Sequence, residues 1–244
     1  MKRVLLFLLG ATILLTVVGT AGQIGKYRHQ MAGDWIDLFD LNQEANIPTW
    51  YSGSLMLVAG LLSYTLSLIE PHPFRGVAPF SAPPEERKLP RITRPNSPNR
   101  YWRFLAFLFF YLSADEMVQL HERLDPFVDK HLGAGGIFYF GCTVVALPIL
   151  ALLGLGLIRF VWQQEKVTRI LLLLSAGIFV MGGLGMEMAG GWYANRYGQD
   201  NLTFACLTIV EEFLEMSGLT ALLYTLARET KARLDTRYIL AHRA

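Results

Sequence analysis

The stretch 209–218, IVEEFLEMSG, decides the fold, because it places three glutamates inside an otherwise apolar helix. The apolar run LTFACLTIV leads into it, and GLTALLYTLA leads out of it. The three acids are Glu211, Glu212 and Glu215. An ionised carboxylate in a dry environment costs many kcal/mol unless a cation or a proton neutralises it. The surroundings of these three side chains are therefore constrained by what neutralises them.

The composition is that of a membrane protein. Of the 244 residues, 52% are hydrophobic and 17% charged, and the mean hydropathy is +0.33. Several stretches approach the roughly 20 residues that cross a hydrocarbon core. We expect six transmembrane helices, at about 4–22, 48–69, 102–124, 136–160, 170–193 and 202–226. The sequence therefore predicts an all-α, polytopic membrane helix bundle that forms a single domain over residues 1–244.

Lysine and arginine are unevenly divided between the two sides of this predicted bundle. Of the 22, 17 fall on the side of the termini and five on the other. The positive-inside rule then places both termini in the cytoplasm. The net charge of +2 needs no nucleic-acid binding to explain it. We expect membrane lipids as partners and the inner (plasma) membrane of a bacterium as the location.

Two segments allow a second interpretation. Residues 1–21 also resemble a secretory signal that ends in a small-residue cleavage site, so cleavage is the alternative to a first span. The cytoplasmic linker 70–100 is rich in proline and arginine and lacks helical periodicity. We expect it to be an extended tether on anionic lipid headgroups. A docking site for a cytoplasmic protein is the alternative.

Acidic residues of three predicted helices lie at one depth. With a rise of about 1.5 Å per residue, they lie about 18–28 Å above the arginines at the inner edge of their helices. Salt bridges can balance few of them, because Arg123, Lys130 and Arg196 are candidates only from the rim of this layer. These acids are Asp115, Glu116, Glu122, Glu187, Glu211, Glu212 and Glu215. They therefore share a layer in the outer half of the bundle.

The predicted facing of these acids supports their convergence. Glu211 and Glu215 are one helical turn apart and share a face. Gly183 lies one turn from Glu187, and Gly218 lies one turn from Glu215. Small residues at this spacing let another helix backbone approach closely. We therefore expect the acids to meet in one interior site.

So many carboxylates need either several protons or a bound cation, and a divalent metal ion is the more economical solution. The predicted metal ligands are Asp115, Glu116, His121, Glu122, Glu187, Glu211, Glu212 and Glu215. Oxygen ligands suit manganese, iron, calcium or magnesium, and zinc if His121 contributes. His121 points away from Asp115 on a regular helix, so it joins the site only if the helix loosens before Pro126.

Three further patterns have structural explanations that we prefer. A methionine follows each of Glu116, Glu187 and Glu215, and we expect adaptable packing rather than a copper site. The outer loop around Asp40 has the alternate acid spacing of a calcium loop but lacks its glycine and its final glutamate, so we expect an ordinary solvated loop. We expect Cys142 and Cys206 to be buried thiols rather than a disulfide.

The motifs NIPTWYS (46–52), DE-x4-HE (115–122) and EE-x2-EM-x-G (211–218) resemble those of uncharacterised bacterial multi-spanning membrane proteins. This resemblance covers the second to sixth predicted spans and transfers no catalytic role. The acid layer itself predicts a membrane protein with a divalent-metal site, which could serve a membrane metalloenzyme. The alternatives are a proton or cation transporter or channel, and a non-catalytic assembly or partner subunit with buried acid pairs.

Overall fold

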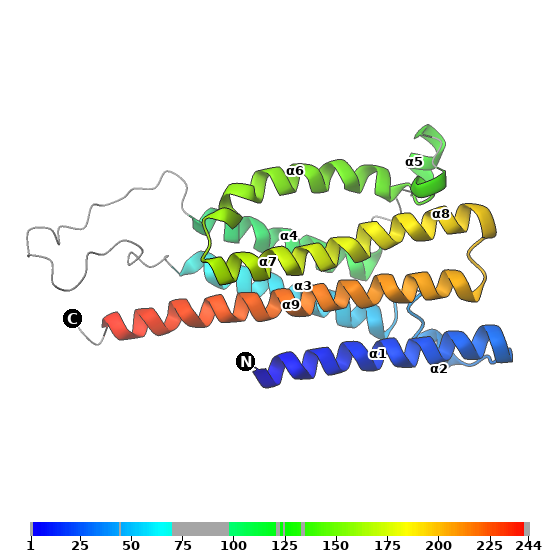
Figure 1. Ribbon diagram of the computed structural model, residues 1–244, viewed down its shortest axis with the longest axis horizontal. Coiled ribbons are helices and arrows are strands. Elements are labelled where there is room, and N and C mark those ends of the chain that lie inside the picture. Colours follow the sequence, from blue (N-terminus) through cyan, green and yellow to red (C-terminus); the bar gives the residue numbers. More distant parts are fainter. Residues whose placement is uncertain are drawn as a thin grey trace, which may run out of the picture.

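The computed structural model describes residues 2–43, 45–69, 98–120, 123, 125–132 and 135–241. Within these residues all the regular secondary structure is helical, and the helices run side by side in an elongated bundle (Figure 1). They are α1 (Lys2–His29), α2 (Asp34–Leu38), α3 (Ile47–Leu68), α4 (Pro98–Val118), α5 (Asp125–Leu132), η2 (Gly136–Phe138), α6 (Cys142–Trp162), α7 (Lys166–Val180), η3 (Met181–Met186), α8 (Glu187–Tyr197) and α9 (Leu202–Ala241). The all-α prediction is confirmed for the described part of the chain.

Four helices of the described part are long and apolar enough to cross a membrane. They are α1, α3, α6 and the continuous helix Lys166–Tyr197, which combines α7, η3 and α8. This finding supports membrane association. The third and sixth predicted spans correspond to α4 and α9, and these are the helices that carry Asp115, Glu116 and the 211–215 glutamates. Six spans therefore remain a prediction.

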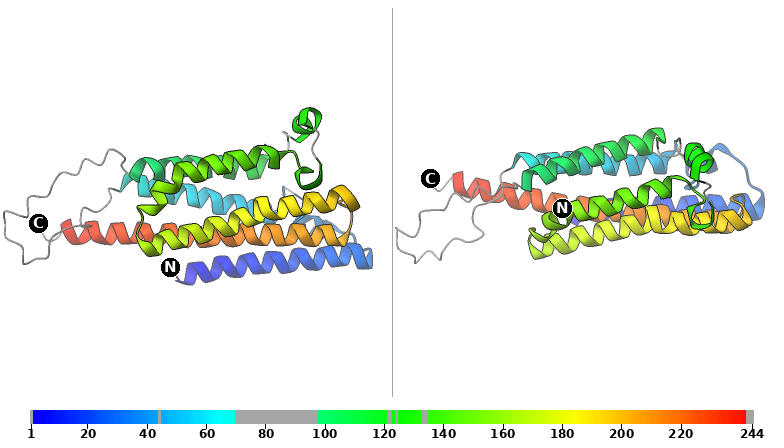
Figure 2. Two further views of the ribbon diagram at one scale, coloured as in Figure 1. Left: turned by 45° about the horizontal axis from the view of Figure 1, so that its top comes forward. Right: turned by 90° about the horizontal axis from the view of Figure 1, so that it is seen from above.

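Helix α9 is the centre of the bundle, because α1, α3, α7, η3 and α8 all contact it. The bundle has two ends: the α2 end, which also holds α5 and the α8–α9 turn, and the linker end, where α3 stops and α4 starts (Figure 1). The start of α1 and the end of α9 both lie toward the linker end (Figure 1). Figure 2 shows α6 on the outside of the bundle, along α7 and α8.

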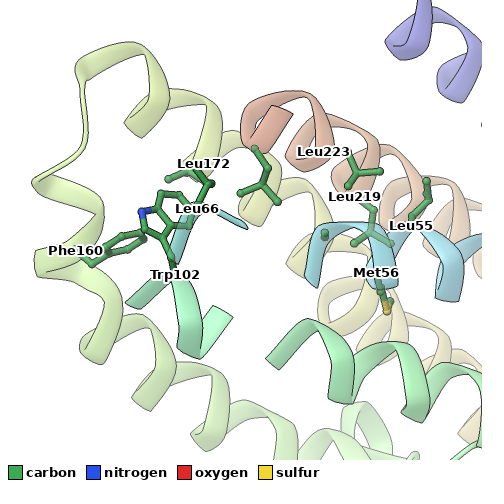
Figure 3. Packing of buried hydrophobic residues seen from close by; sticks show 10 residues of the cluster. Leu55, Met56, Leu66, Trp102, Phe160, Leu172, Leu219 and Leu223 are labelled. Carbon is green, nitrogen blue, oxygen red and sulfur yellow. The ribbon is translucent and has the colours of Figure 1, made fainter. Parts of the chain in front are cut away.

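The main apolar core joins α3, α4, α6, α7 and α9. Leucines of α9, including Leu219 and Leu223, pack against Leu55 and Met56 of α3 (Figure 3). Toward the linker end the Phe160 ring of α6 meets the Trp102 ring of α4 edge to face, with 4.8 Å between their centroids. This core holds one half of the bundle together without charged side chains.

The loop between α1 and α3 is fastened to both by buried polar groups. The Asp40 side chain is fully buried, accepts hydrogen bonds from the Gln23 side chain and the Asn42 backbone, and pairs with Lys26 at 3.6 Å. Asn46 caps α3 by accepting from the Thr49 backbone N–H at 3.1 Å. The loop is therefore not solvated as we expected, because Asp40 is buried and its carboxylate has partners within the protein.

Several boundaries differ from the predictions: α1 continues past 22 to His29, and α6 begins at Cys142 rather than at 136. Helix α4 ends at Val118 rather than at 124, because Gln119 adopts a left-handed backbone conformation with φ of 56° that a regular helix does not allow. Helix α9 continues past 226 to Ala241, since no proline or glycine interrupts it there. Residues 98–100 of the predicted linker 70–100 belong to α4, and the rest of that linker lies outside the described residues.

The close packing of α9 on α7 yields a test. A Cβ atom at Gly218 would lie 2.6 Å from the backbone nitrogen of Phe179, so Gly218→Ala forces the two helices apart. We expect a loss of about 1–3 kcal/mol of stability, as for other overpacked sites. The measurement is thermal unfolding in detergent. The matched control is Gly154→Ala on α6, where no atom lies within 4 Å of the Cβ position, and it should be neutral or stabilising. Equal effects of both variants would contradict this account of the α7–α9 contact.

Candidate carboxylate site

Glu215 of α9 lies at the centre of a group of carboxylates from three helices. The charged groups that act on it are Glu212, Glu116, Glu211 and Glu187. Glu211 is in turn acted on by Glu187 and Glu212. We call these five glutamates, Glu116, Glu187, Glu211, Glu212 and Glu215, the acid cluster. The turns of α4, α8 and α9 that lie in the α2-end half of the bundle thus direct their carboxylates toward one region.

All five side chains of the acid cluster are half-buried. They are neither in the closed apolar core nor on the freely exposed surface. A carboxylate in this position keeps part of its charge accessible to a small ion or to water while losing much of its hydration. The acid cluster is therefore placed to bind a cation or protons.

The π-helical turn η3 provides the close contact between the acid cluster and the fifth predicted span. A Cβ at Gly182 would lie 2.8 Å from the Glu211 carbonyl oxygen, and one at Gly183 would lie 2.6 Å from Oε1 of Glu215. Only glycine leaves room for the Glu215 carboxylate against this backbone. Single π-helical turns inside α-helices occur frequently at functional sites. Gly182 and Gly183 are thus part of the site although they carry no side chain.

Glu187 links the acid cluster to α6. The Cys142 thiol, at the first residue of α6, donates a hydrogen bond of 2.9 Å to Oε1 of Glu187. This contact fixes the α2 end of α6 beside the start of α8. It also shows that Glu187 faces protein, as the glycines around it predicted. Neither Cys142 nor Cys206 forms a disulfide, and Cys206 is exposed rather than buried as we had expected.

The ion pairs among the described residues do not involve Glu211 or Glu215. Those of Lys26, Arg228 and Arg233 are formed with other acids. Arg196, a candidate from the rim, lies over the Trp192 ring at 4.5 Å. An ion pair within the described residues therefore does not explain how Glu211 and Glu215 are tolerated.

The predicted metal ligands have different outcomes. The structure brings Glu116, Glu187, Glu211, Glu212 and Glu215 together. Asp115 is half-buried on α4, but it is Glu116 whose charge acts on Glu215. His121 and Glu122 lie outside the described residues. Their predicted places in the site, including the proposed loosening of the helix at His121, therefore stay predictions, although the helix is already interrupted at Gln119.

The described residues do not form a closed set of metal ligands. Among the described residues, no three histidine, cysteine, aspartate or glutamate side chains are arranged as a group that could hold one metal ion. The five carboxylates converge without closing around a common point. A metal ion would therefore require changes of side-chain rotamer in the acid cluster.

Sequence reasoning missed two parts of the site. The π-helical turn has a signal in the run MGGLGM, since closely spaced glycines tolerate an irregular turn. The hydrogen bond from Cys142 had no signal, because its two residues are 45 positions apart. The methionine interpretation is supported at Met216, which is fully buried and packs with Leu15, Leu41 and Ile209.

The fold and this site define an all-helical, membrane-associated protein with a carboxylate cluster inside its bundle. The chain belongs to the family described as Domain of unknown function (DUF8692), whose family model matches residues 5–229. That match includes every residue of the acid cluster. No curated protein and no solved structure matches the chain.

The crowding of charge predicts the effect of removing one carboxylate. In the presence of a chelator at pH 8, Glu215→Gln should raise the melting temperature in detergent, because it relieves repulsion among the acid cluster. The comparison variant is Glu229→Gln, which should lower the melting temperature, because Glu229 pairs with Arg233 at 2.9 Å. A fall in melting temperature for Glu215→Gln would show that the Glu215 charge is already balanced within the protein.

Proposed function

We propose that this protein is a six-span membrane protein, with both termini in the cytoplasm, that binds a divalent cation at the acid cluster in the outer half of the bundle. The observation that carries the proposal is the convergence of four glutamates on the half-buried Glu215 without an ion pair to Glu211 or Glu215 among the described residues. A bound cation compensates such a concentration of negative charge directly.

The choice of a metal over other cations rests on the donor set. Carboxylate oxygens are the ligands of manganese, iron, calcium and magnesium, and three of the helices each supply at least one. A metal ion held there would act as a Lewis acid or activate water or dioxygen. The protein itself supplies the orientation of the carboxylates, through the contacts of Gly182 and Gly183 with α9 and through the bond from Cys142 to Glu187.

The topology part of the proposal can be tested separately by cysteine labelling. In a variant without Cys142 and Cys206, single cysteines are introduced at Gln199, in the exposed α8–α9 turn, and at Lys231, on the exposed end of α9. An impermeant maleimide added to intact cells should label position 199 and spare position 231 until the membrane is broken. Labelling of both positions from the same side would refute six spans with cytoplasmic termini.

The metal part is tested by elemental analysis of purified protein. We expect about one divalent metal ion per chain in the wild type and roughly tenfold less after Glu211→Gln with Glu215→Gln, because two oxygen ligands are lost. The control double variant is Glu165→Gln with Asp235→Asn, which removes two exposed acids of the linker end. Wild-type protein without stoichiometric metal, or equal loss in both double variants, would reject the metal site.

Melting curves with and without a chelator add the dependence on pH. Protons compete with the cation for the carboxylates, so stability supplied by the metal is present at pH 8 and is lost as the pH falls. The chelator should therefore lower the melting temperature at pH 8 and have little effect at pH 5.

A second candidate function, a proton path, is favoured by a different observation. The hydroxyls of Ser63 on α3 and Thr220 on α9 are fully buried and have no hydrogen-bond partner among the described residues. Thr220 lies five residues beyond Glu215, or about 7.5 Å toward the linker end. Buried hydroxyls along this direction could relay protons from the acid cluster. Protein without metal that is more stable at pH 5 than at pH 8 would favour this function.

A further inference from the structure

The motif NIPTWYS (46–52) ends in Ser52, which lies in the second turn of α3. Its side chain is 0% exposed, and its hydroxyl has no hydrogen-bond partner among the described residues. Other buried hydroxyls of the bundle, such as those of Ser175 and Thr225, donate to the carbonyl oxygen one turn before them. A buried hydroxyl without a partner has lost its hydrogen bonds to water and gained none in return. The position of Ser52 in the bundle therefore indicates what satisfies it.

Contacts between α3 and α9 place Ser52 at the level of Glu215. Tyr51, the residue before Ser52, packs against the apolar group that contains the residue after Glu215. One turn toward the linker end, Met56 belongs to the same core as Leu219 (Figure 3). Ser52 precedes Met56 by four residues, and Glu215 precedes Leu219 by four, which is about one helical turn in each case. Ser52 and Glu215 thus lie at one level of the α3–α9 contact.

Helix α4 brings Glu116 to the same turn of α3. The Ser113 hydroxyl donates a hydrogen bond of 2.8 Å to the carbonyl oxygen of Gly53, the residue after Ser52. A Cβ at Gly53 would lie 2.7 Å from Cε of Met117, the residue after Glu116. The turn that carries Glu116 is therefore in close contact with the turn that carries Ser52. Ser52 thus lies where α3 meets carboxylate-bearing turns of both α4 and α9.

We propose that Ser52 is the oxygen ligand through which α3 contributes to the cation site, and that the cation is one that prefers oxygen ligands, such as Mn²⁺ or Mg²⁺. This inference rests on the proposed function, because it concerns the cation at the acid cluster. Two separate observations meet at this place. Carboxylates of three helices converge, and a fully buried hydroxyl of a fourth helix has no partner among the described residues. A serine hydroxyl also binds Mg²⁺ in the phosphate-binding loops of other proteins.

The chemistry of a hydroxyl suits this position. A neutral oxygen adds a ligand without adding to the repulsion among the acid cluster, whereas a further carboxylate would increase that repulsion. A lone pair of the Ser52 oxygen binds the cation, and the hydroxyl hydrogen is donated to a carboxylate of the acid cluster. Carboxylate and hydroxyl oxygens together favour magnesium, manganese and calcium over soft cations, which prefer sulfur ligands.

The first test measures the affinity for Mn²⁺ of full-length protein in detergent, after its metal has been removed with a chelator. Ser52→Ala should weaken Mn²⁺ binding by roughly tenfold, as is typical when a metal site loses one supporting partner. The matched control is Ser67→Ala. Ser67 is a buried serine of α3 that lies about 22 Å nearer the linker end and donates to the Tyr64 carbonyl oxygen. This control should bind Mn²⁺ like the wild type.

A second variant, Ser52→Cys, distinguishes ligation from a purely structural role. It replaces one oxygen atom by sulfur, and sulfur favours softer cations such as Cd²⁺. The ratio of Cd²⁺ affinity to Mn²⁺ affinity should therefore rise by roughly tenfold relative to the wild type. The wild-type ratio already includes any contribution of Cys142. Ser67→Cys should leave the ratio unchanged.

The outcomes separate this inference from the proposed function. A wild type that does not bind Mn²⁺ would reject the cation site and the role of Ser52 together. Wild-type binding with equal Mn²⁺ affinity in Ser52→Ala, or with an unchanged affinity ratio in Ser52→Cys, would retain the cation site and overturn the role of Ser52. Melting temperatures of the metal-free proteins identify any variant that does not fold. If Ser52→Ala is unfolded, the affinity ratio of Ser52→Cys, which changes a single atom, decides.

Discussion

The neutralisation of carboxylates beside an apolar phase is the constraint on which this structure depends. Burying an unpaired charge costs more free energy than one packing contact contributes. An acid inside a bundle is therefore stable only with a cation or a proton that neutralises it. Here the compensation is not a basic residue paired with Glu211 or Glu215 in the described part of the chain. The acids instead come from separate helices and lie close to one another, which makes them suited to share one positive charge.

The surrounding fold keeps these mutually repelling groups in place. Close contacts at Gly182, Gly183 and Gly218 fix α9 against the fifth predicted span on both sides of Glu215. The apolar core around Leu219 and Leu223 continues the same contact toward the linker end. Attraction from packing is thus located next to the electrostatic repulsion, and the helices cannot separate to relieve that repulsion without losing the core.

How much of the structure could be predicted from the sequence depended on the kind of interaction. The helices and the close approach at Gly218 followed from patterns within one segment, namely apolar length and glycine spacing. The convergence of α8 and α9 carboxylates also followed from depth. The end of α4 at Gln119, the π-helical turn and the bond of Cys142 to Glu187 did not, because each depends on local backbone geometry or on contacts between distant segments. His121 and Glu122 follow the end of α4 in the sequence and lie outside the described residues. The local backbone geometry there decides whether they reach the site.

The length of α9 has a mechanical consequence. Its 40 residues form a single helix of about 60 Å, twice the thickness of a hydrocarbon core. From the contact at Gly218 to Ala241 the helix extends for about 34 Å, so a tilt of about 10° at that contact would displace its far end by about 6 Å. Arg233 opposes such a tilt, since its guanidinium donates to the carbonyl oxygens of Leu66 and Ile69 at the end of α3 and pairs with Glu229. One continuous helix thus joins the acid cluster to a charged end, and the contacts of Arg233 tie that end to α3.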